Sequence, residues 1–105
     1  MTEITVRELK AKHDAGESFV LLDVREPDEL AIVSLPWATV IPMAHVAQRM
    51  HELPADGDIV VMCHFGGRSE AVTRFLNANG FPRAVNLAGG IDAYAAEIDP
   101  ALARY

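Results

Sequence analysis

Cysteine is scarce in this chain of 105 residues: Cys63 stands alone, so no disulfide can form within the chain. Basic residues are also few, because 9 lysines and arginines face 15 aspartates and glutamates and leave a formal net charge of −6. Proteins that bind nucleic acids or anionic membrane surfaces usually carry a basic patch, so neither partner is expected. A local positive site for an anionic substrate remains compatible with this overall balance.

Long apolar runs are missing as well, since none approaches the roughly 20 residues that span a bilayer. The first residues, Met-Thr-Glu-Ile, are neither basic nor part of a long apolar stretch, so no signal peptide is predicted. We therefore expect a cytoplasmic protein of one domain over residues 1–105, in which 50% hydrophobic residues build one core. A lone cysteine in such a protein is either a small buried hydrophobe or a reactive thiol.

Segments typical of strands and helices alternate along the chain. Continuous apolar runs at residues 19–22 and 59–62 predict strands buried on both faces of a parallel sheet. Shorter strands are expected at 39–41 and 85–87, and helices at about 6–14, 27–32, 44–53, 68–79 and after Gly89-Gly90. The apolar stripe of the helix at 68–79 is expected at Ala71, Val72, Phe75 and Leu76. The alternation predicts an α/β fold with a central parallel sheet flanked by helices.

The second buried strand is followed by Cys63-His64-Phe65-Gly66-Gly67-Arg68-Ser69, which leads into a helix. Ligands bind at the carboxyl ends of strands in open α/β sheets. The N–H groups of a loop that enters a helix point inward, and the helix dipole adds about half a positive charge at the amino end of the helix. Glycines permit the tight curl that such a loop needs. Together with the charge of Arg68, these features predict a lowered pKa for the Cys63 thiol and a nucleophilic thiolate. The alternative is a structural cysteine beside an ordinary Gly-Gly turn.

Three segments carry motifs that occur together in one known family. Cys63, Gly66, Arg68 and Ser69 match a loop that begins with Cys, has Gly three residues later and continues through Arg-Ser. The run Asp23-Val24-Arg25-Glu26 and the pair Gly89-Gly90 match two further motifs in the right order. With these segments, which extend over nearly the whole chain, the protein resembles a single-domain rhodanese. The tail at 99–105 is similar to that of free-standing bacterial members, which favours a complete protein.

The resemblance implies the rhodanese fold, a central parallel β-sheet flanked by α-helices. It implies that Cys63 is the nucleophile that bears a persulfide, and that the backbone amides from His64 to Ser69 form a cradle for the sulfur. Arg68 would orient the loop or meet an anionic substrate, and Ser69 would cap the helix or support the persulfide. The implied reaction moves a sulfane sulfur from thiosulfate or a protein persulfide to a thiol, cyanide or a sulfur-carrier protein, with no cofactor.

Two other functions fit parts of the motif. Non-catalytic rhodanese-like binding modules share the fold but often lose the cysteine, which this chain keeps together with Arg68. Cysteine-dependent phosphatases and arsenate reductases have a similar loop with five residues between Cys and Arg, whereas four lie between Cys63 and Arg68. The shorter loop forms a tighter ring, which suits a single sulfur better than a tetrahedral phosphate.

The segment at 33–38 departs from the family pattern, because Ser34 and Trp37 stand where His and Gly are common. Trp37 is either an exposed aromatic used in recognition or a packing residue. The same segment resembles rhodanese domains fused to enzymes that activate ubiquitin-like sulfur carriers. That similarity points to a carrier protein as the acceptor.

Several polar side chains near the motifs have two interpretations each. Asp23 could hydrogen-bond the loop or pair with a cation at the site, or it could cap a turn. Arg25 could face the pocket, although an ion pair with Glu26 or Glu29 is the favoured role. These two residues are included as supporting members of the site.

Two residues of the loop itself also have open roles. His64 could shift the pKa of Cys63 or contact substrate, or it could face solvent. Phe65 could form an apolar wall for the substrate or anchor the loop. The remaining histidines have no spacing typical of metal ligands and no second cysteine to join them, so no metal site is predicted.

Overall fold

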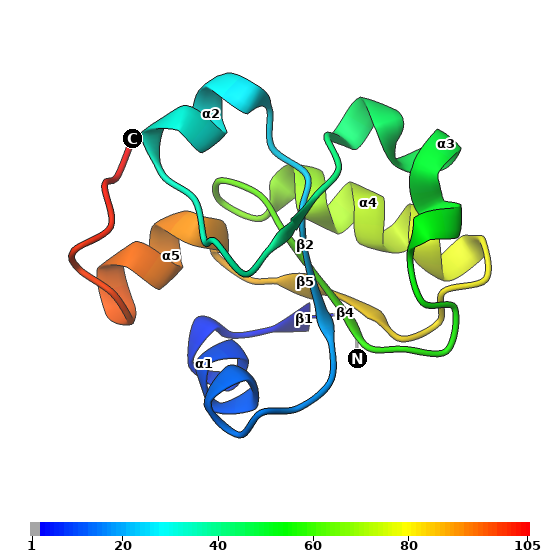
Figure 1. Ribbon diagram of the computed structural model, residues 1–105, viewed down its shortest axis with the longest axis horizontal. Coiled ribbons are helices and arrows are strands. Elements are labelled where there is room, and N and C mark those ends of the chain that lie inside the picture. Colours follow the sequence, from blue (N-terminus) through cyan, green and yellow to red (C-terminus); the bar gives the residue numbers. More distant parts are fainter. Residues whose placement is uncertain (1–2) are drawn as a thin grey trace.

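The computed structural model describes residues 3–105, in which five parallel strands form one sheet with helices on both faces (Figure 1). The strands are β1 (Glu3–Ile4), β2 (Val20–Asp23), β3 (Thr39–Val40), β4 (Ile59–Met62) and β5 (Ala84–Leu87). They lie in the order β1-β5-β4-β2-β3, and every neighbouring pair runs parallel. The α/β fold with a central parallel sheet is thus confirmed, and the central strand β4 leads directly to Cys63.

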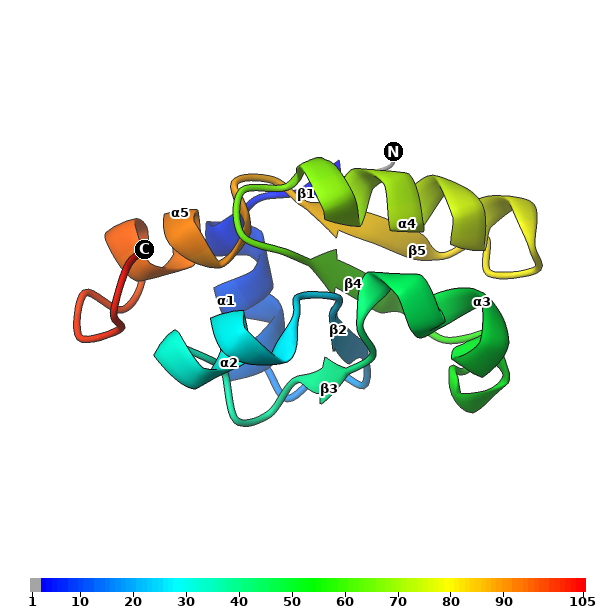
Figure 2. The same ribbon diagram turned by 90° about the horizontal axis from the view of Figure 1, so that it is seen from above.

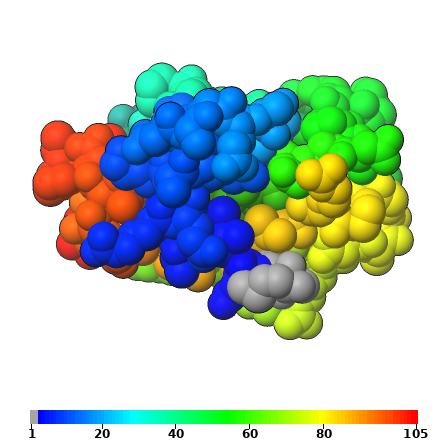
Figure 3. All heavy atoms as spheres, turned by 90° about the horizontal axis from the view of Figure 1, so that it is seen from below, coloured from blue at the N-terminus to red at the C-terminus, as the bar shows by residue number. Residues whose placement is uncertain are grey.

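Helices cover the two faces of this sheet. They are α1 (Val6–Asp14), α2 (Pro27–Ile32), α3 (Val46–Arg49), α4 (Gly67–Ala78) and α5 (Gly90–Glu97). Figure 2 shows α3 and α4 beside each other. The buried side chains form two hydrophobic clusters. Side chains of α3 and α4 belong to the first cluster, and side chains of α1 and α5 belong to the second. Figure 3 shows the face on which α1 lies beside α5. No helix within residues 3–105 is long and apolar enough to cross a membrane.

The central strand explains why its sequence is a continuous apolar run. Successive side chains of a strand point to opposite faces of the sheet. Ile59 and Val61 therefore pack with α3 and α4, whereas Val60 and Met62 pack with α1 and α5. All four side chains are buried, so neither face of β4 can carry polar residues.

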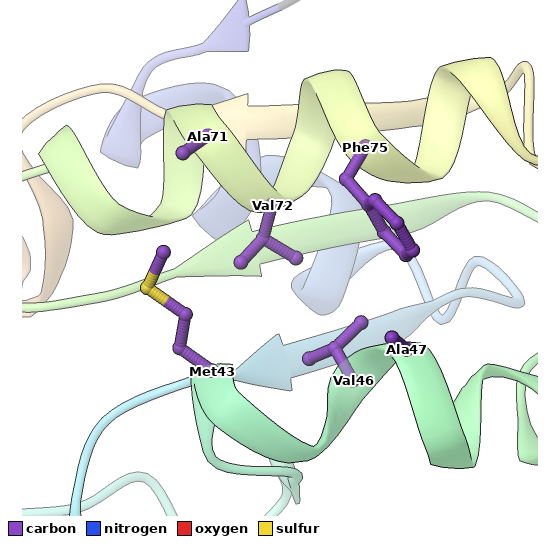
Figure 4. A pocket seen from close by; sticks show the side chains of 6 residues that line it. All are labelled: Met43, Val46, Ala47, Ala71, Val72 and Phe75. Carbon is purple, nitrogen blue, oxygen red and sulfur yellow. The ribbon is translucent and has the colours of Figure 1, made fainter.

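The buried side of α4 differs from the expected apolar stripe. Val72 and Leu76 are buried as predicted, but Ala71 and Phe75 line a surface groove beside α3 (Figure 4). Ser69 and Thr73 complete the buried side instead. These hydroxyls can be buried because each finds a hydrogen-bond partner, and Thr73 donates to the carbonyl of Ser69 at 2.8 Å.

One other expectation needs correction, and one strand was not expected. The helix expected at 44–53 is divided into a 3₁₀ turn (Met43–His45), the single turn α3 and a second 3₁₀ turn (Met50–Glu52). The edge strand β1 was not predicted, because two residues are too few to show a period.

Trp37 is a packing residue in the layer that contains α1. Its ring stacks on His13 with 3.8 Å between the ring centroids and meets the ring of Phe19 edge-on at 6.0 Å. The side chain is half-buried and joins the hydrophobic cluster on that face of the sheet. Of its two interpretations, the structure shows the packing one.

Candidate active site

Cys63 lies at the carboxyl end of the central strand, in a loop that Figure 1 shows between α2 and α5. The residue is 1% exposed. Its Sγ accepts hydrogen bonds from the backbone N–H of Gly66 at 3.1 Å, the backbone N–H of Ser69 at 3.4 Å and the hydroxyl of Ser69 at 3.2 Å. The sulfur is therefore surrounded by donors contributed by the loop and by the first turn of α4.

These donors decide the acidity of the thiol. Burial raises the pKa of Cys63, because a buried thiolate loses hydration. The hydrogen bonds from the Ser69 hydroxyl and from the backbone N–H groups of Ser69, Gly66 and Arg68 lower it by more. The net result is a pKa below the ordinary value of a cysteine, which favours the nucleophilic thiolate.

The two glycines of the loop have different roles. Gly66 has a φ of +115°, a conformation that side chains other than glycine rarely adopt, and it begins α4 as its N-cap. Gly67 lies inside α4 with a negative φ, and a Cβ added there would meet no atom within 4 Å. The positive φ in the loop therefore requires glycine at Gly66, whereas the backbone at Gly67 would accept a side chain.

The start of α5 holds the opposite side of the loop. The N–H of Ile91 donates to the carbonyl of Cys63 at 2.9 Å, and the N–H of Asp92 donates to the carbonyl of His64 at 3.1 Å. Gly90 permits this approach, because a Cβ at that position would collide with both carbonyls. The Gly-Gly motif recognised in the sequence thus brings the amino end of α5 against the loop.

Asn86, in β5, is a site residue that the motifs did not indicate. It is 4% exposed, and its Oδ1 accepts the hydroxyl of Ser69 at 2.5 Å while its Nδ2 donates to the carbonyl of Gly66 at 3.2 Å. The amide therefore holds two residues of the sulfur cradle. A signal was present in the sequence, because an asparagine between Val85 and Leu87 in a buried strand needs hydrogen-bond partners.

Arg68 pairs with a carboxylate on α2. Its Nη1 and Nη2 donate to Oε1 and Oε2 of Glu29 at 2.6 and 2.8 Å, a bidentate pair. The hydroxyl of Tyr105 also donates to Oε2 of Glu29, at 2.7 Å. These hydrogen bonds from Arg68 lower the pKa of Glu29 to about 2, and they raise the pKa of Arg68.

Asp23 and Arg25 form an ion pair behind the loop. Both side chains are fully buried, and Nη2 of Arg25 lies 2.8 Å from Oδ2 of Asp23. Arg25 also donates to the carbonyl of Val33 at 2.9 Å and to the hydroxyl of Tyr105 at 3.1 Å. The carboxylate partner of Arg25 is thus Asp23, not Glu26 or Glu29 as the sequence favoured. The pair fixes α2 and the segment after it beside the sheet.

His64 and Phe65 form an aromatic stack with the last residue of the chain. The His64 ring lies 3.7 Å from the ring of Tyr105 at an angle of 5°, and 3.7 Å from the ring of Phe65 at 30°. Phe65 is 62% exposed, so it does not anchor the loop by burial.

Among residues 3–105, no three histidine, cysteine, aspartate or glutamate side chains gather in a group that could hold a metal ion.

Comparison with known proteins places this loop in a family. Residues 5–97 match the rhodanese-like domain. The sulfurtransferase of Allochromatium vinosum is 37% identical over 95 residues, which are 90% of this chain and 89% of that protein. The putative sulfurtransferase YtwF of Bacillus subtilis is 38% identical over 98 residues, 93% of this chain and 94% of that protein. The chain belongs to the rhodanese-like domain family, as its motifs indicated.

The solved structures agree with this assignment. The rhodanese-like domain protein from Staphylococcus aureus has a TM-score of 0.86 at 32% identity, with 100% of this chain and 99% of that chain covered.

Two other curated relatives are longer than this chain. The chain spans 37% of the rhodanese-like/PpiC domain-containing protein 12 of Arabidopsis thaliana and 48% of the putative sulfur carrier protein YrkF of Bacillus subtilis, at 34% and 36% identity.

Proposed function

We propose that this protein is a sulfurtransferase that carries a sulfane sulfur as a persulfide on Cys63. The observation that supports this most directly is the set of three hydrogen bonds that Sγ accepts from Gly66 and Ser69. Donors that lower the pKa of a thiol also stabilise the negative charge of a persulfide on the same residue. The relatives named sulfurtransferases add support, because they align over nearly the whole chain.

The first half of the reaction loads Cys63. The thiolate attacks the outer sulfur of a donor, which is thiosulfate or a protein persulfide. With thiosulfate, a new S–S bond forms to Sγ, the bond between the two sulfurs of the donor breaks, and its electron pair leaves with sulfite. With a persulfide R–S–SH, the leaving group is the thiolate R–S⁻. Covalent catalysis of this kind divides one transfer into two easier steps.

The second half returns Cys63 to its thiolate form. A thiol, cyanide or the thiol of a sulfur carrier attacks the outer sulfur of the persulfide, and the electron pair of the broken S–S bond returns to Sγ. Because the chain has one cysteine, the acceptor must supply the attacking group. A protein acceptor is supported by the relative named a putative sulfur carrier protein, which contains a similar domain. The reduced thiols of the cytoplasm, the compartment expected for this protein, would keep Cys63 active.

The two other functions are less well supported by the geometry. A binding module without catalysis would have no need for three donors aimed at one sulfur. A phosphatase would need an arginine free to hold the phosphate, whereas both Nη atoms of Arg68 donate to Glu29.

Intact-mass measurement tests the proposal. The purified protein, incubated with excess thiosulfate or with a small-molecule persulfide and then desalted, should gain the mass of one sulfur atom. The gain should be lost on reaction with cyanide and be absent in Cys63→Ser. No gain from either donor, under conditions in which a known rhodanese gains one, would refute the proposal. Rapid hydrolysis of an aryl phosphate by the same preparation would favour the phosphatase instead.

A further inference from the structure

One edge of the guanidinium of Arg68 is already occupied. Nη1 and Nη2 donate to the two oxygens of Glu29 at 2.6 and 2.8 Å. A sulfonate or phosphate would bind through the same two nitrogens in the same planar geometry. An anionic donor that binds this edge of the guanidinium must therefore displace Glu29, and at the remaining N–H groups it meets a charge that Glu29 already balances.

Glu29 is held firmly in this position. Its Oε2 accepts the hydroxyl of Tyr105 at 2.7 Å, and its Oε1 accepts the N–H of Glu26 at 3.1 Å. Burial raises the pKa of Tyr105 above its ordinary value, so the phenol stays protonated and remains a donor. The side chain of Glu29 is only 15% exposed, which limits competition by water.

Charge near the loop is consequently balanced. The pair of Arg68 with Glu29 is linked through Tyr105 to the pair of Arg25 with Asp23, so two cations meet two anions. The chain as a whole is negative, with a formal net charge of −6. A small dianion that approaches the sulfur therefore meets the backbone dipoles of the loop but no uncompensated cation from this network.

We infer that Glu29 determines donor specificity, because it keeps Arg68 paired and so favours sulfur donors with a single negative charge or none over dianionic thiosulfate. The favoured class is the persulfides of proteins or of small thiols. The inference rests on the proposed function and narrows the first half of that reaction. Tyr105 supports the same selection, since it restrains the Glu29 carboxylate.

Two sulfur donors can be compared to measure how the charge of the donor affects the loading of Cys63. Thiosulfate and the methanethiosulfonate anion both present a terminal sulfur bonded to a second sulfur that carries oxygens, but the first has two negative charges and the second has one. In each case Sγ forms a bond to the terminal sulfur, the S–S bond of the donor breaks, and sulfite or methanesulfinate leaves with the electron pair. The ratio of the two rate constants therefore reports mainly how the site responds to the additional charge.

The experiment compares wild type, Glu29→Gln and Asp28→Asn by the second-order rate constant for Cys63 persulfide formation, followed by intact mass. Asp28 is the matched control, because it is exposed on the same helix and makes none of the ion pairs found in residues 3–105. In Glu29→Gln the ratio of the rate constant for thiosulfate to that for methanethiosulfonate should rise about tenfold. The reason is that an unpaired Arg68 at a protein surface stabilises the additional negative charge of thiosulfate enough to change a rate constant by about that factor. Asp28→Asn should change the ratio by less than about twofold.

Tyr105→Phe provides a second test that keeps the carboxylate and the ring. It removes one restraint on Glu29, so the ratio should rise in the same direction but by only about twofold to threefold. General damage to the loop would slow both donors together and leave the ratio unchanged. An unchanged ratio in folded Glu29→Gln and in Tyr105→Phe would overturn the inference while leaving the proposed function intact. Failure of wild type to form a persulfide with these two donors and also with a small-molecule persulfide would refute the proposed function itself.

Discussion

The hydroxyl oxygen of Ser69 lies 2.5 Å from Oδ1 of Asn86, which joins the first turn of α4 to strand β5. The same hydroxyl lies 3.2 Å from Sγ of Cys63, yet it has one proton to donate. Nδ2 of Asn86 faces the carbonyl of Gly66, so Oδ1 must face Ser69. When Cys63 is protonated, its S–H can donate to Ser69 and Ser69 to Asn86. When Cys63 ionises, Oδ1 and the sulfur share the hydroxyl proton.

Ser69→Ala should raise the pKa of the Cys63 thiol. The variant loses the side-chain hydrogen bond that stabilises the thiolate but keeps the burial that opposes it. Because this hydrogen bond stabilises the charged form of the thiol, we expect the pKa to shift upward. The pH dependence of alkylation by iodoacetamide measures this. Ser34→Ala, an exposed serine outside the loop, is the control, and identical profiles for the two variants would contradict the prediction.

Asn86→Ala should destabilise the fold without raising the pKa of Cys63. The variant removes the donor to the buried carbonyl of Gly66, a loss of roughly 1–3 kcal/mol in the free energy of unfolding. The proton of Ser69 is then free for the sulfur, so the pKa should stay or fall. Urea unfolding and the alkylation profile measure the two effects. Asn79→Ala, an exposed residue with one bond to the carbonyl of Phe75, should cost less than about 1 kcal/mol. A pKa that rises as in Ser69→Ala would exclude this arrangement.

Local patterns in the sequence predict much of the fold and the position of the nucleophile. Apolar runs of four residues mark β2 and β4, and the loop motif places Cys63 at the end of the latter. These features depend on neighbours within a few positions, which is the range that periodicity and turn residues report. The spacing of Thr5 and Glu8, three positions apart, is likewise typical of a capping box at the start of α1, and both of its hydrogen bonds are present.

Contacts between distant segments could not be predicted in this way. Glu29 and Arg68 are 39 positions apart, and Tyr105 and Glu29 are 76 apart. Their meeting depends on the path of the chain around the sheet, which no local pattern encodes. The partner of Arg25 was missed for a different reason: Glu26 is its neighbour in the chain and Glu29 lies in the first turn of α2, but the carboxylate that pairs with its guanidinium is the buried Asp23.

Gly90→Ala should be far more damaging than Gly67→Ala. A Cβ at Gly90 would collide with the carbonyls of Cys63 and His64 at a φ of +59°, whereas Gly67 has open space and a negative φ. We expect a loss of about 2 kcal/mol or more for Gly90→Ala. Gly67→Ala should change stability little or raise it by up to about 1 kcal/mol, because alanine favours helices. Thermal unfolding of the two variants checks this, and equal losses would show that the loop does not require the close approach of α5.

Glu29→Gln should lower stability in a pH-dependent way. The pKa of Glu29 is about 2 in the folded protein and 4.5 ordinarily, so its contribution is present above about pH 4.5 and is lost as the pH falls through about 2. Because Arg68 is more than one third exposed, solvent reduces the contribution to roughly 1–3 kcal/mol. Urea unfolding of wild type and variant should therefore give curves that differ most near neutral pH and converge toward the lowest pH at which both fold. A constant difference over that range would show that Glu29 stabilises the protein by packing alone, while a larger difference at low pH would contradict the depressed pKa.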